Sequence, residues 1–261
     1  MEDLDRPREV PGAAADILRT LEALGFAWDG AVLYQSRRDH AYAEAIERLR
    51  GEGRIYPCGC SRKEIAERGW PGAEGPVYPG TCRTGLAPER RPRALRIHTG
   101  ANRIGYRDRI LGAIEQDLAR EVGDFVLRRA DGIHAYQLAV VVDDAEQGIT
   151  QIVRGADLVR STPRQIFLQR LLGLPTPGYA HLPLVVDYEG RKLSKSTAAA
   201  PVDPADPIPA LLRAWAFLGQ PPLPEKPLCA REFWSAAIPL WDLARTPATL
   251  ARPIHGGSRA R

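Results

Sequence analysis

The chain of 261 residues is long enough for one large domain or one domain with appendages, and its 44% hydrophobic and 26% charged residues are typical of a globular protein. Its formal net charge of +4 permits a polyanionic partner without requiring one. No apolar run approaches the roughly 20 residues of a membrane-spanning helix, and the first residues do not resemble a signal peptide, so we expect no membrane partner and a cytoplasmic location.

The spacing of the apolar residues predicts helices and strands that alternate along the chain. Helical periodicity, bounded by proline or glycine, covers residues 11–25, 39–53, 161–173 and 209–219. Short strands are expected at 31–36, 94–99, 103–108, 124–129, 149–155 and 181–186. The run 133–144 is apolar almost throughout, which is typical of a segment buried on both sides within a parallel sheet. Alternation of this kind predicts an α/β core with a mostly parallel sheet.

The stretch GRKLSKST, residues 190–197, follows an apolar strand and combines three cations with small and hydroxylated residues. Ligands of an open α/β fold bind at the carboxyl ends of the strands, so this loop would project at that edge. Lys192 and Lys195 suit the phosphates of a nucleotide, because lysine supplies a mobile positive charge and the neighbouring hydroxyls supply donors. A solvated basic turn is the plainer alternative for two lysines at this spacing.

Three of the four cysteines, Cys58, Cys60 and Cys82, lie close together in a segment rich in glycine and proline. Such a cluster favours a metal site in a reducing compartment over a framework of disulfides. Zinc takes four tetrahedral ligands, and from the sequence alone the nearest histidine downstream that would complete the set is His98. Three free cysteines without a metal are the simpler alternative.

The residues of the basic loop carry a resemblance to a known family. KLSKS, residues 192–196, resembles the signature loop of the class I aminoacyl-tRNA synthetases, which is usually written KMSKS. Three blocks resemble the glutamyl and glutaminyl branch of that class and occur in the family order: residues 2–30, 135–168 and 181–196. The resemblance implies a Rossmann-like α/β catalytic domain and a ligase that activates its amino acid with ATP.

Two features resemble a shortened paralogue of glutamyl-tRNA synthetase more closely than the full-length enzyme. Only residues 197–261 follow the signature loop, which is enough for a small helical region but not for the anticodon-binding domain of full-length members. The pattern CGC followed by YPGTC is similar to the zinc insert of the paralogue, which attaches glutamate to the queuosine base in the anticodon of tRNA(Asp). The resemblance therefore implies ATP, L-glutamate and tRNA(Asp) as partners of a monomeric enzyme, with Mg²⁺ accompanying the ATP.

The resemblance also assigns roles to single residues. Lys195, the second lysine of the signature, matches the family's catalytic contact with ATP, and Lys192 is a second ATP-binding candidate. The family's glutamate-binding positions match Glu2, Tyr136 and Arg154. We expect Arg154 to hold a carboxylate of glutamate with a bidentate fork, Glu2 to accept from its ammonium group, and Tyr136 to offer a hydroxyl.

Asp143 and Asp144 are neighbouring carboxylates at the end of the apolar run, but we do not assign them to acid–base catalysis. Activation of an amino acid starts from a carboxylate that is already ionised, so the reaction needs no such pair. Carboxylates in this position more commonly bind ribose hydroxyls, cap a helix or hold an arginine.

For the zinc site, the family pattern places a tyrosine four residues before the last cysteine, where Tyr78 stands. Tyr78 is therefore preferred to His98 as the fourth ligand of one structural zinc ion per chain, beside the three clustered cysteines. A tyrosine ligand is uncommon, because the metal must lower a pKa near 10. A segment with few large apolar residues can hardly build its own core, so the metal would stabilise its fold.

The expected organisation has four parts: the first part of the catalytic core at 1–56, a zinc-binding insert at 57–100, the rest of the core with the KLSKS loop at 101–200, and a helical C-terminal region at 201–261. Two other functions stay open at this point. One is the catalytic fragment of an ordinary glutamyl-tRNA synthetase, and the other is a zinc-stabilised RNA-binding module without catalysis.

The run EDLDRP near the first residue resembles the middle of a family block rather than a beginning. In the family a strand, a phosphate-binding turn with a HIGH-type motif and a helix precede this run, and the five histidines of the chain include no H-x-G-H-like pair. We expect either a start assigned to an internal methionine, which we favour, or a true truncation. On this hypothesis the 261 residues alone fold poorly and do not activate glutamate.

Overall fold

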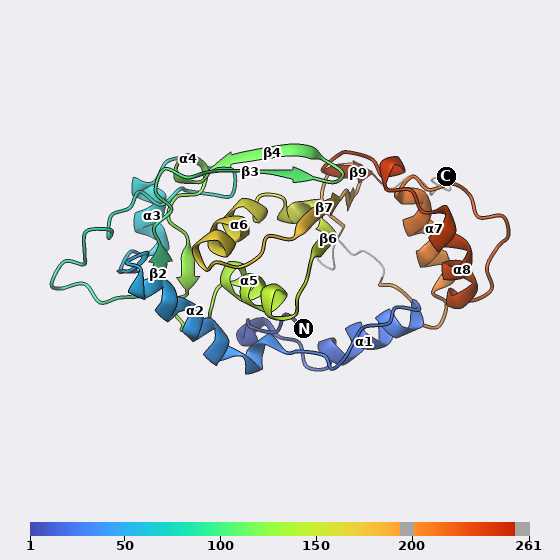
Figure 1. The fold of residues 1–261 in the computed structure, drawn as a ribbon, viewed down its shortest axis with the longest axis horizontal. Helices are drawn as coiled ribbons and strands as arrows, with labels where there is room; N and C mark the ends of the chain where they lie inside the picture. The colour runs from blue at the N-terminus through green and yellow to red at the C-terminus, as the bar shows by residue number, and fades with distance from the viewer. Residues whose placement is uncertain (194–200, 254–261) are drawn as a thin grey trace.

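The computed structural model describes residues 1–193 and 201–253, which form an elongated α/β molecule (Figure 1). Helices α5 and α6 lie in the middle, the cysteine-bearing segment lies at one end, and helices α7 and α8 lie at the other (Figure 1). Within the described residues, no helix is both long and apolar enough to cross a membrane.

The main sheet has four strands in the order β4-β3-β7-β6. Strands β6 (Gln151–Gly155) and β7 (Gly178–Leu182) are parallel, and helix α6 (Thr162–Leu171) connects them after the short 3-10 helix η3 (Ala156–Leu158). Strands β3 (Arg103–Asp108) and β4 (Gly112–Asp117) form an antiparallel hairpin, which joins the parallel pair through the single residue pair Asp108–Tyr179. The mostly parallel sheet expected from the sequence is therefore a mixed one.

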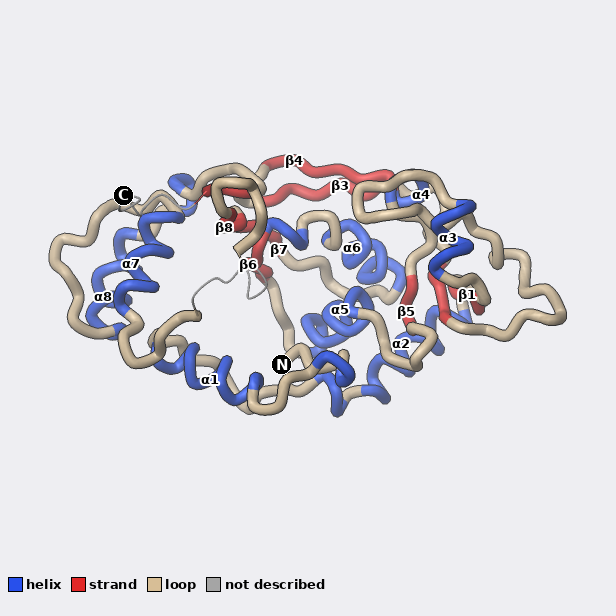
Figure 2. Tube along the Cα trace, turned by 180° about the vertical axis from the view of Figure 1, so that it is seen from behind, coloured by secondary structure: helices blue, strands red, loops and turns tan. Residues whose placement is uncertain are grey.

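Figure 2 shows from behind that the β3–β4 hairpin runs along one long edge of the molecule. Two smaller sheets complete the strand structure of residues 1–193 and 201–253. In the first, β1 (Ile55–Cys58), β2 (Ala94–Ile97) and β5 (Val126–Arg128) are antiparallel, with Pro57 tolerated because β1 is an edge strand. In the second, β8 (Leu184–Val186) pairs in parallel with β9 (Ala251–Pro253).

The apolar run at 133–144 is a helix, α5 (Tyr136–Glu146), and not a strand of a parallel sheet. It packs against α6 on one side and α2 (Asp39–Gly51) on the other, so it buries residues around most of its circumference. A short helix buried on both sides has the same continuous apolar pattern as a buried strand, and periodicity does not separate the two. Leu138 and Ala139 are fully buried in the main core, together with side chains of α2, α6 and β3.

Two further strand predictions need correction. Residues 31–36 form no strand, and the chain there passes into the 3-10 helix η2 (Gln35–Arg37). The run 181–186 is divided between β7 and β8, because Pro183 stands between them and lacks the N–H group that a continued ladder needs. The strands predicted at 94–99, 103–108, 124–129 and 149–155 are confirmed as β2, β3, β5 and β6.

The helices predicted from periodicity are confirmed as α1 (Ala13–Ala23), α2, α6 and α7 (Ile208–Phe217). Shorter helical segments not predicted from the sequence are η1 (Arg6–Arg8), α3 (Arg62–Arg68), α4 (Leu118–Glu121) and η5 (Leu243–Arg245). Helix α8 (Ala230–Leu240) packs on α7 around Trp215 and Phe233. The indole of Trp234 donates to the carbonyl of Leu24 at 2.7 Å, which ties this helical pair to the end of α1.

Candidate functional site

Arg154 lies near the end of β6, and its guanidinium is held from three directions. Its Nε donates to Nε2 of His181 at 3.2 Å, and its Nη2 donates to Oγ1 of Thr162 and Oε1 of Gln165 at 2.7 Å each. The ring of Tyr179 lies beneath the charge, with its centroid 5.5 Å from the guanidinium carbon. These contacts come from β7 and α6, the elements that the parallel crossover places next to β6.

Three hydrogens of the guanidinium are thus used within the protein. Nη1 makes no hydrogen bond to any of the described residues, so its two hydrogens are left for a ligand. The bidentate fork expected from the sequence would need two guanidinium nitrogens, whereas this arrangement offers one. Arg154 can donate from Nη1 to a single carboxylate while the remaining nitrogens keep it in place.

Glu2, Tyr136 and Asp144 lie within the electrostatic reach of Arg154. Burial raises the pKa of Glu2, although the N-terminal ammonium group and Arg154 oppose the change. Burial also raises the pKa of Asp144, to about 6, and Asp143 and Glu2 act in the same direction. Burial, followed by the charge of Glu2, raises the pKa of Tyr136. The structure therefore brings together the three glutamate-binding candidates and adds Asp144.

A cavity of about 460 Å³ opens beside Glu2 and Asp144, between α1, the segment 28–35 and α5. Its walls are mainly apolar, with the two carboxylates and Asp143 among the polar groups. A volume in this range is typical of sites for small molecules. Two partly desolvated carboxylates at such a site favour a ligand with a positively charged group. Burial raises their pKa values, and a nearby positive charge stabilises their ionised forms.

Asp143 differs from Asp144, because the carboxylate of Asp143 accepts hydrogen bonds from other side chains of the protein. It accepts from Nε2 of Gln35 at 2.8 Å, from Nε of Arg38 at 2.8 Å and from the hydroxyl of Tyr42 at 2.9 Å. It therefore holds an arginine and joins α5 to α2, one of the roles expected for this pair of residues.

Of the two lysines in the KLSKS loop, only Lys192 belongs to the described residues, and Lys195 lies outside them. Nζ of Lys192 contacts Oδ2 of Asp157 at 2.5 Å. Asp157 follows β6 by two residues, so the loop meets the main sheet at the edge where Arg154 lies. Lys192, an ATP-binding candidate, and Arg154, a glutamate-binding candidate, are thus attached to the same strand end.

The three clustered cysteines and Tyr78 meet in a small cluster at the base of the segment between β1 and β2. The sulfur atoms of Cys58, Cys60 and Cys82 lie within 4.8 Å of one another, and those of Cys60 and Cys82 are 3.5 Å apart. The hydroxyl of Tyr78 lies 3.5 Å from Sγ of Cys58 and 3.9 Å from Sγ of Cys60. His98, by contrast, is exposed and is not part of this cluster.

These separations fit a tetrahedral metal. With Zn–S bonds of about 2.3 Å, two sulfur ligands of one zinc ion are roughly 3.8 Å apart. Burial, the neighbouring thiol of Cys82 and the charge of Cys58 raise the pKa of Cys60 to about 11. A bound cation would lower this pKa again, because its positive charge stabilises the thiolate.

The segment 59–93, which carries Cys60, Tyr78 and Cys82, leaves and re-enters the core through β1 and β2, where Cys58 pairs with Ala94. Asp124, a fully buried residue just before β5, holds the segment to the core. It accepts from Nε and Nη2 of Arg83 at 2.5 and 3.0 Å and from the hydroxyl of Tyr56 at 2.5 Å.

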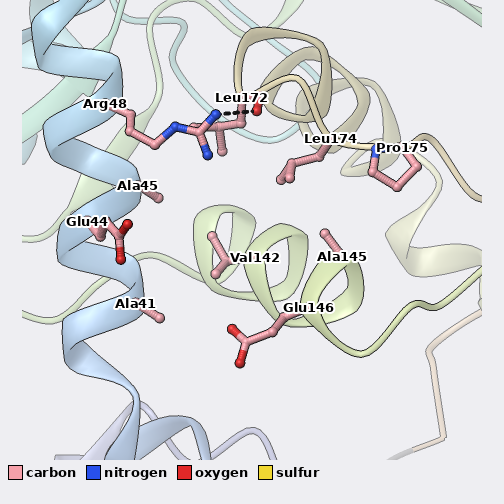
Figure 3. A pocket seen from close by; sticks show the side chains of 10 residues that line it. All are labelled: Ala41, Glu44, Ala45, Arg48, Val142, Ala145, Glu146, Leu172, Leu174 and Pro175. Atoms are coloured by element: carbon pink, nitrogen blue, oxygen red, sulfur yellow. Dashed lines mark hydrogen bonds between the residues drawn. The ribbon is translucent and has the colours of Figure 1, made fainter.

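A second cavity, of about 270 Å³, lies between α2 and α5 (Figure 3). Figure 3 shows Arg48 above it, with its guanidinium directed to the carbonyl of Leu172, which accepts at 2.8 Å. The remaining lining is mostly small or apolar, apart from Glu44 and Glu146. The sequence-predicted site residues that the structure describes do not line this cavity.

Residues 1–232 match the model of a known family, described as tRNA synthetases class I (E and Q), catalytic domain. The chain belongs to this family. It is therefore a ligase of the aminoacyl-tRNA synthetase type, with the α/β fold of that catalytic domain. The recognition from the KLSKS loop and its flanking blocks is confirmed.

Relatives of this synthetase are similar along nearly the whole chain. Glutamyl-Q tRNA(Asp) synthetase of Aromatoleum aromaticum is 53% identical over 262 residues, which cover 100% of this chain and 83% of the relative. The enzyme of the same name from Chromobacterium violaceum is 55% identical over 248 residues, covering 95% of this chain and 83% of the relative.

Two solved structures share the fold of the synthetase. Glutamate-tRNA synthetase from Elizabethkingia anophelis has a TM-score of 0.73 at 24% identity and covers 96% of this chain. A glutamate tRNA ligase from Elizabethkingia meningosepticum, solved with its amino acid, has a TM-score of 0.74 at 23% identity and covers 97% of this chain. The match spans 60% and 59% of these two solved chains.

The sequence did not indicate the residues that hold Arg154. His181 stands in a predicted strand, and Thr162 and Gln165 stand in a predicted helix, but no local pattern marks them as partners of Arg154. A polar residue in an otherwise apolar strand was the available signal for His181, because a fully buried histidine needs partners for its ring nitrogens.

Proposed function

We propose that this synthetase activates L-glutamate with ATP and transfers the glutamyl group to queuosine in the anticodon of tRNA(Asp). The observation that carries the proposal is the fixed guanidinium of Arg154, with Nη1 left for a carboxylate and the carboxylates of Glu2 and Asp144 in its electrostatic reach. Glutamate carries the complementary groups, two carboxylates and one ammonium. The names of relatives that are more than 50% identical support the choice of tRNA.

In the first step a carboxylate oxygen of glutamate forms a bond to the α-phosphorus of ATP, while the bond from that phosphorus to pyrophosphate breaks. No covalent nucleophile from the protein is required, so the residues act by positioning the substrates and by placing charge. Arg154 holds one carboxylate, Glu2 accepts from the ammonium group and Tyr136 offers its hydroxyl. Lys195, with Lys192 beside it, supplies positive charge at the phosphates. Mg²⁺ accompanying ATP would neutralise part of the phosphate charge.

Pyrophosphate exchange tests the first step, and glutamate-dependent exchange by the 261-residue chain would also contradict the expectation that these residues alone do not activate glutamate. Incorporation of labelled pyrophosphate into ATP should depend on glutamate, and glutamine should not replace it, because an amide offers no negative charge to Arg154. Lys195→Ala should lower the exchange rate by orders of magnitude while glutamate binding changes little. Lys226→Ala is the matched control, since Lys226 is exposed in the C-terminal region and belongs to neither site. Exchange at the wild-type rate in Lys195→Ala would show that Lys195 does not act at the phosphates.

Transfer distinguishes this proposal from the alternatives. The enzyme should label tRNA(Asp) that carries queuosine, and neither tRNA(Asp) with an unmodified wobble guanosine nor tRNA(Glu) should accept glutamate. Labelling of tRNA(Glu) would indicate the catalytic part of an ordinary glutamyl-tRNA synthetase. Absence of glutamate-dependent exchange together with RNA binding would indicate an RNA-binding module.

We further propose that Cys58, Cys60, Tyr78 and Cys82 hold one structural zinc ion, and that the segment around them is an insert in a catalytic core. When bound, zinc would cross-link the segment 59–93, which has few large apolar residues of its own. Elemental analysis should find about one zinc per chain, and Cys58→Ser and Cys82→Ser should each lose it. The exposed Cys229 supplies the control, because Cys229→Ser should keep the metal. Full zinc content in both ligand variants would exclude the site.

A further inference from the structure

Asp108, the last residue of β3, is a buried carboxylate with both oxygens in use. Its Oδ1 accepts from the backbone N–H groups of Ile110 and Leu111 at 2.9 Å each, and from that of His181 at 3.3 Å. Its Oδ2 lies 2.6 Å from Nδ1 of His181. Burial opposes ionisation, but these hydrogen bonds outweigh it and keep the pKa of Asp108 below its ordinary value. Asp108 is therefore a fixed anion that demands a proton on Nδ1 of the imidazole.

His181 is fully buried, and its ring connects Asp108 to Arg154. With the proton on Nδ1, Nε2 carries a lone pair, and both groups that face it can donate: Nε of Arg154 at 3.2 Å and the hydroxyl of Thr162 at 3.1 Å. A proton on Nε2 would instead point at a guanidinium N–H group. Burial also lowers the pKa of His181, which favours the neutral ring. The ring of Tyr179 stacks on the imidazole and limits its rotation.

We propose that His181, oriented by Asp108, is a positioning residue that sets the direction in which Arg154 presents Nη1 to the carboxylate of glutamate. The inference rests on the proposed function for the identity of the ligand. A free arginine side chain has many rotamers, and fixing it before the ligand arrives lowers the entropy lost on binding. Thr162 and Gln165 engage only Nη2, and the bond from Nε to His181 engages a second nitrogen, so the guanidinium is fixed on two sides and its direction depends on His181 as well.

A purely structural role is the competing explanation, because the hairpin β3–β4 joins β7 through one residue pair and the Asp108–His181 contact reinforces that junction. The two explanations differ in what they predict for a substitution that keeps the shape. Asp108→Asn is such a substitution. Its Oδ1 can keep the backbone N–H groups, while its Nδ2 donates to Nδ1 of His181 and forces the ring proton onto Nε2. The imidazole would stay in place but turn a donor toward Arg154.

Calorimetric binding of glutamate and of ATP to Asp108→Asn separates the two explanations. The positioning role predicts that the Kd for glutamate rises about tenfold or more, the loss expected for a hydrogen bond to a charged group, while the Kd for ATP stays within about twofold. Equal losses for both ligands, or an unchanged Kd for glutamate, would overturn the inference. If the wild-type chain itself does not bind glutamate, the proposed function fails first, which is a different result.

Two substitutions of His181 sharpen the test. In His181→Gln the amide reaches the position of Nε2 and can present an oxygen to Arg154, whereas in His181→Asn the amide reaches only the position of Nδ1, next to Asp108. Glutamate affinity should therefore be higher in His181→Gln than in His181→Asn, although both alter the junction between the strands. The reverse order, or equal affinities, would contradict the role of the Nε2 lone pair.

One measurement needs no substitution and no ligand. Long-range ¹⁵N–¹H NMR correlations of the histidine-labelled wild-type chain report which imidazole nitrogen carries the proton. The proposed positioning role requires the neutral Nδ1–H form of His181 near neutral pH. A neutral Nε2–H form, or a doubly protonated ring, would refute it even if every variant failed to fold.

Discussion

Replacing Asp124 by asparagine should loosen the attachment of the cysteine-bearing segment to the core. Asp124 is fully buried, and its carboxylate accepts from the guanidinium of Arg83 at 2.5 and 3.0 Å and from Tyr56 at 2.5 Å. It also accepts from the backbone N–H and the hydroxyl of Thr99, at 2.9 and 3.0 Å. Arg83 follows Cys82 directly, so this ion pair fixes the last cysteine of the cluster relative to β5.

The size of the effect follows from these contacts. Breaking a buried ion pair by removing one partner typically costs about 3–5 kcal/mol, because the other charge stays buried. The side chain of Arg83 is 37% exposed, so water solvates part of its charge after the loss. Asparagine also keeps an oxygen for Thr99. We therefore expect the free energy of unfolding to fall by about 2 kcal/mol, near the lower end for a charged hydrogen bond.

Urea unfolding at pH 7, followed by far-ultraviolet circular dichroism, measures this difference. Asp131→Asn is the matched control: Asp131 pairs with Arg129 at 2.7 Å, but both side chains are more than a third exposed. Exposed pairs contribute about 0–1 kcal/mol, so this variant should unfold close to the wild type. The reasoning would be wrong if Asp124→Asn cost no more than Asp131→Asn.

The same variant has a defined pH dependence. Burial raises the pKa of Asp124, but Arg83, Tyr56 and the N–H of Thr99 outweigh it, so the pKa lies below its ordinary value. A carboxyl group with a lowered folded-state pKa contributes stability above its unfolded pKa of about 3.9 and loses that contribution as the pH falls through the folded value. The gap in stability between the wild type and Asp124→Asn should be full from pH 7 to about pH 5 and shrink below about pH 4. A gap that grows toward acid would contradict this assignment.

Three other perturbations test the remaining contacts. Arg154→Lys keeps the charge, but a lysine cannot donate to three protein acceptors and a ligand at once. We therefore expect the affinity for glutamate, measured by calorimetry, to fall by roughly 10- to 100-fold, while ATP binding is preserved. Unchanged affinity would show that charge alone suffices. Tyr78→Phe leaves three thiolates, so zinc should bind but transfer faster to a chelator, and an equal transfer rate would remove Tyr78 from the ligand set. Trp234→Phe keeps the ring but loses its 2.7 Å bond to the carbonyl of Leu24, so thermal unfolding should show a loss of about 1 kcal/mol, and a wild-type melting curve would show that this bond contributes nothing.

The sequence predicted the elements whose signals are local. Helices α2 and α6 have helical spacing and recognisable ends, and both occur where expected. Helix α5 was mistaken for part of the sheet because it is buried between two helices, so polar residues do not mark one face of it. Strand β4 (Gly112–Asp117) was missed because GAIEQD has few apolar residues, and its pairing with β3 supplies what its own propensity does not.

For the site, the resemblance supplied the residues that we propose to bind the substrates, and the structure supplied the residues that hold Arg154. Arg154 was assigned from the sequence, but its partner His181 is 27 residues further along the chain and Asp108 is 73 residues before that histidine. No local pattern encodes contacts at such separations. They arise when strands pair, so they depend on register, which the sequence specified only through its apolar faces.

The arrangement of the strands explains why these polar groups meet where they do. The parallel register of β6 and β7 pairs Arg154 with His181 directly, and the single pair between β3 and β7 brings Asp108 opposite Tyr179, two residues before that histidine. All three polar residues stand in the last two positions of their strands, at the edge where parallel α/β sheets bind ligands. A slip of one residue between β6 and β7 would turn one partner to the opposite face, which would separate the guanidinium from the imidazole. The orientation of Arg154 is therefore a consequence of sheet register, and the hairpin β3–β4 contributes to it through the contact of Asp108 with His181.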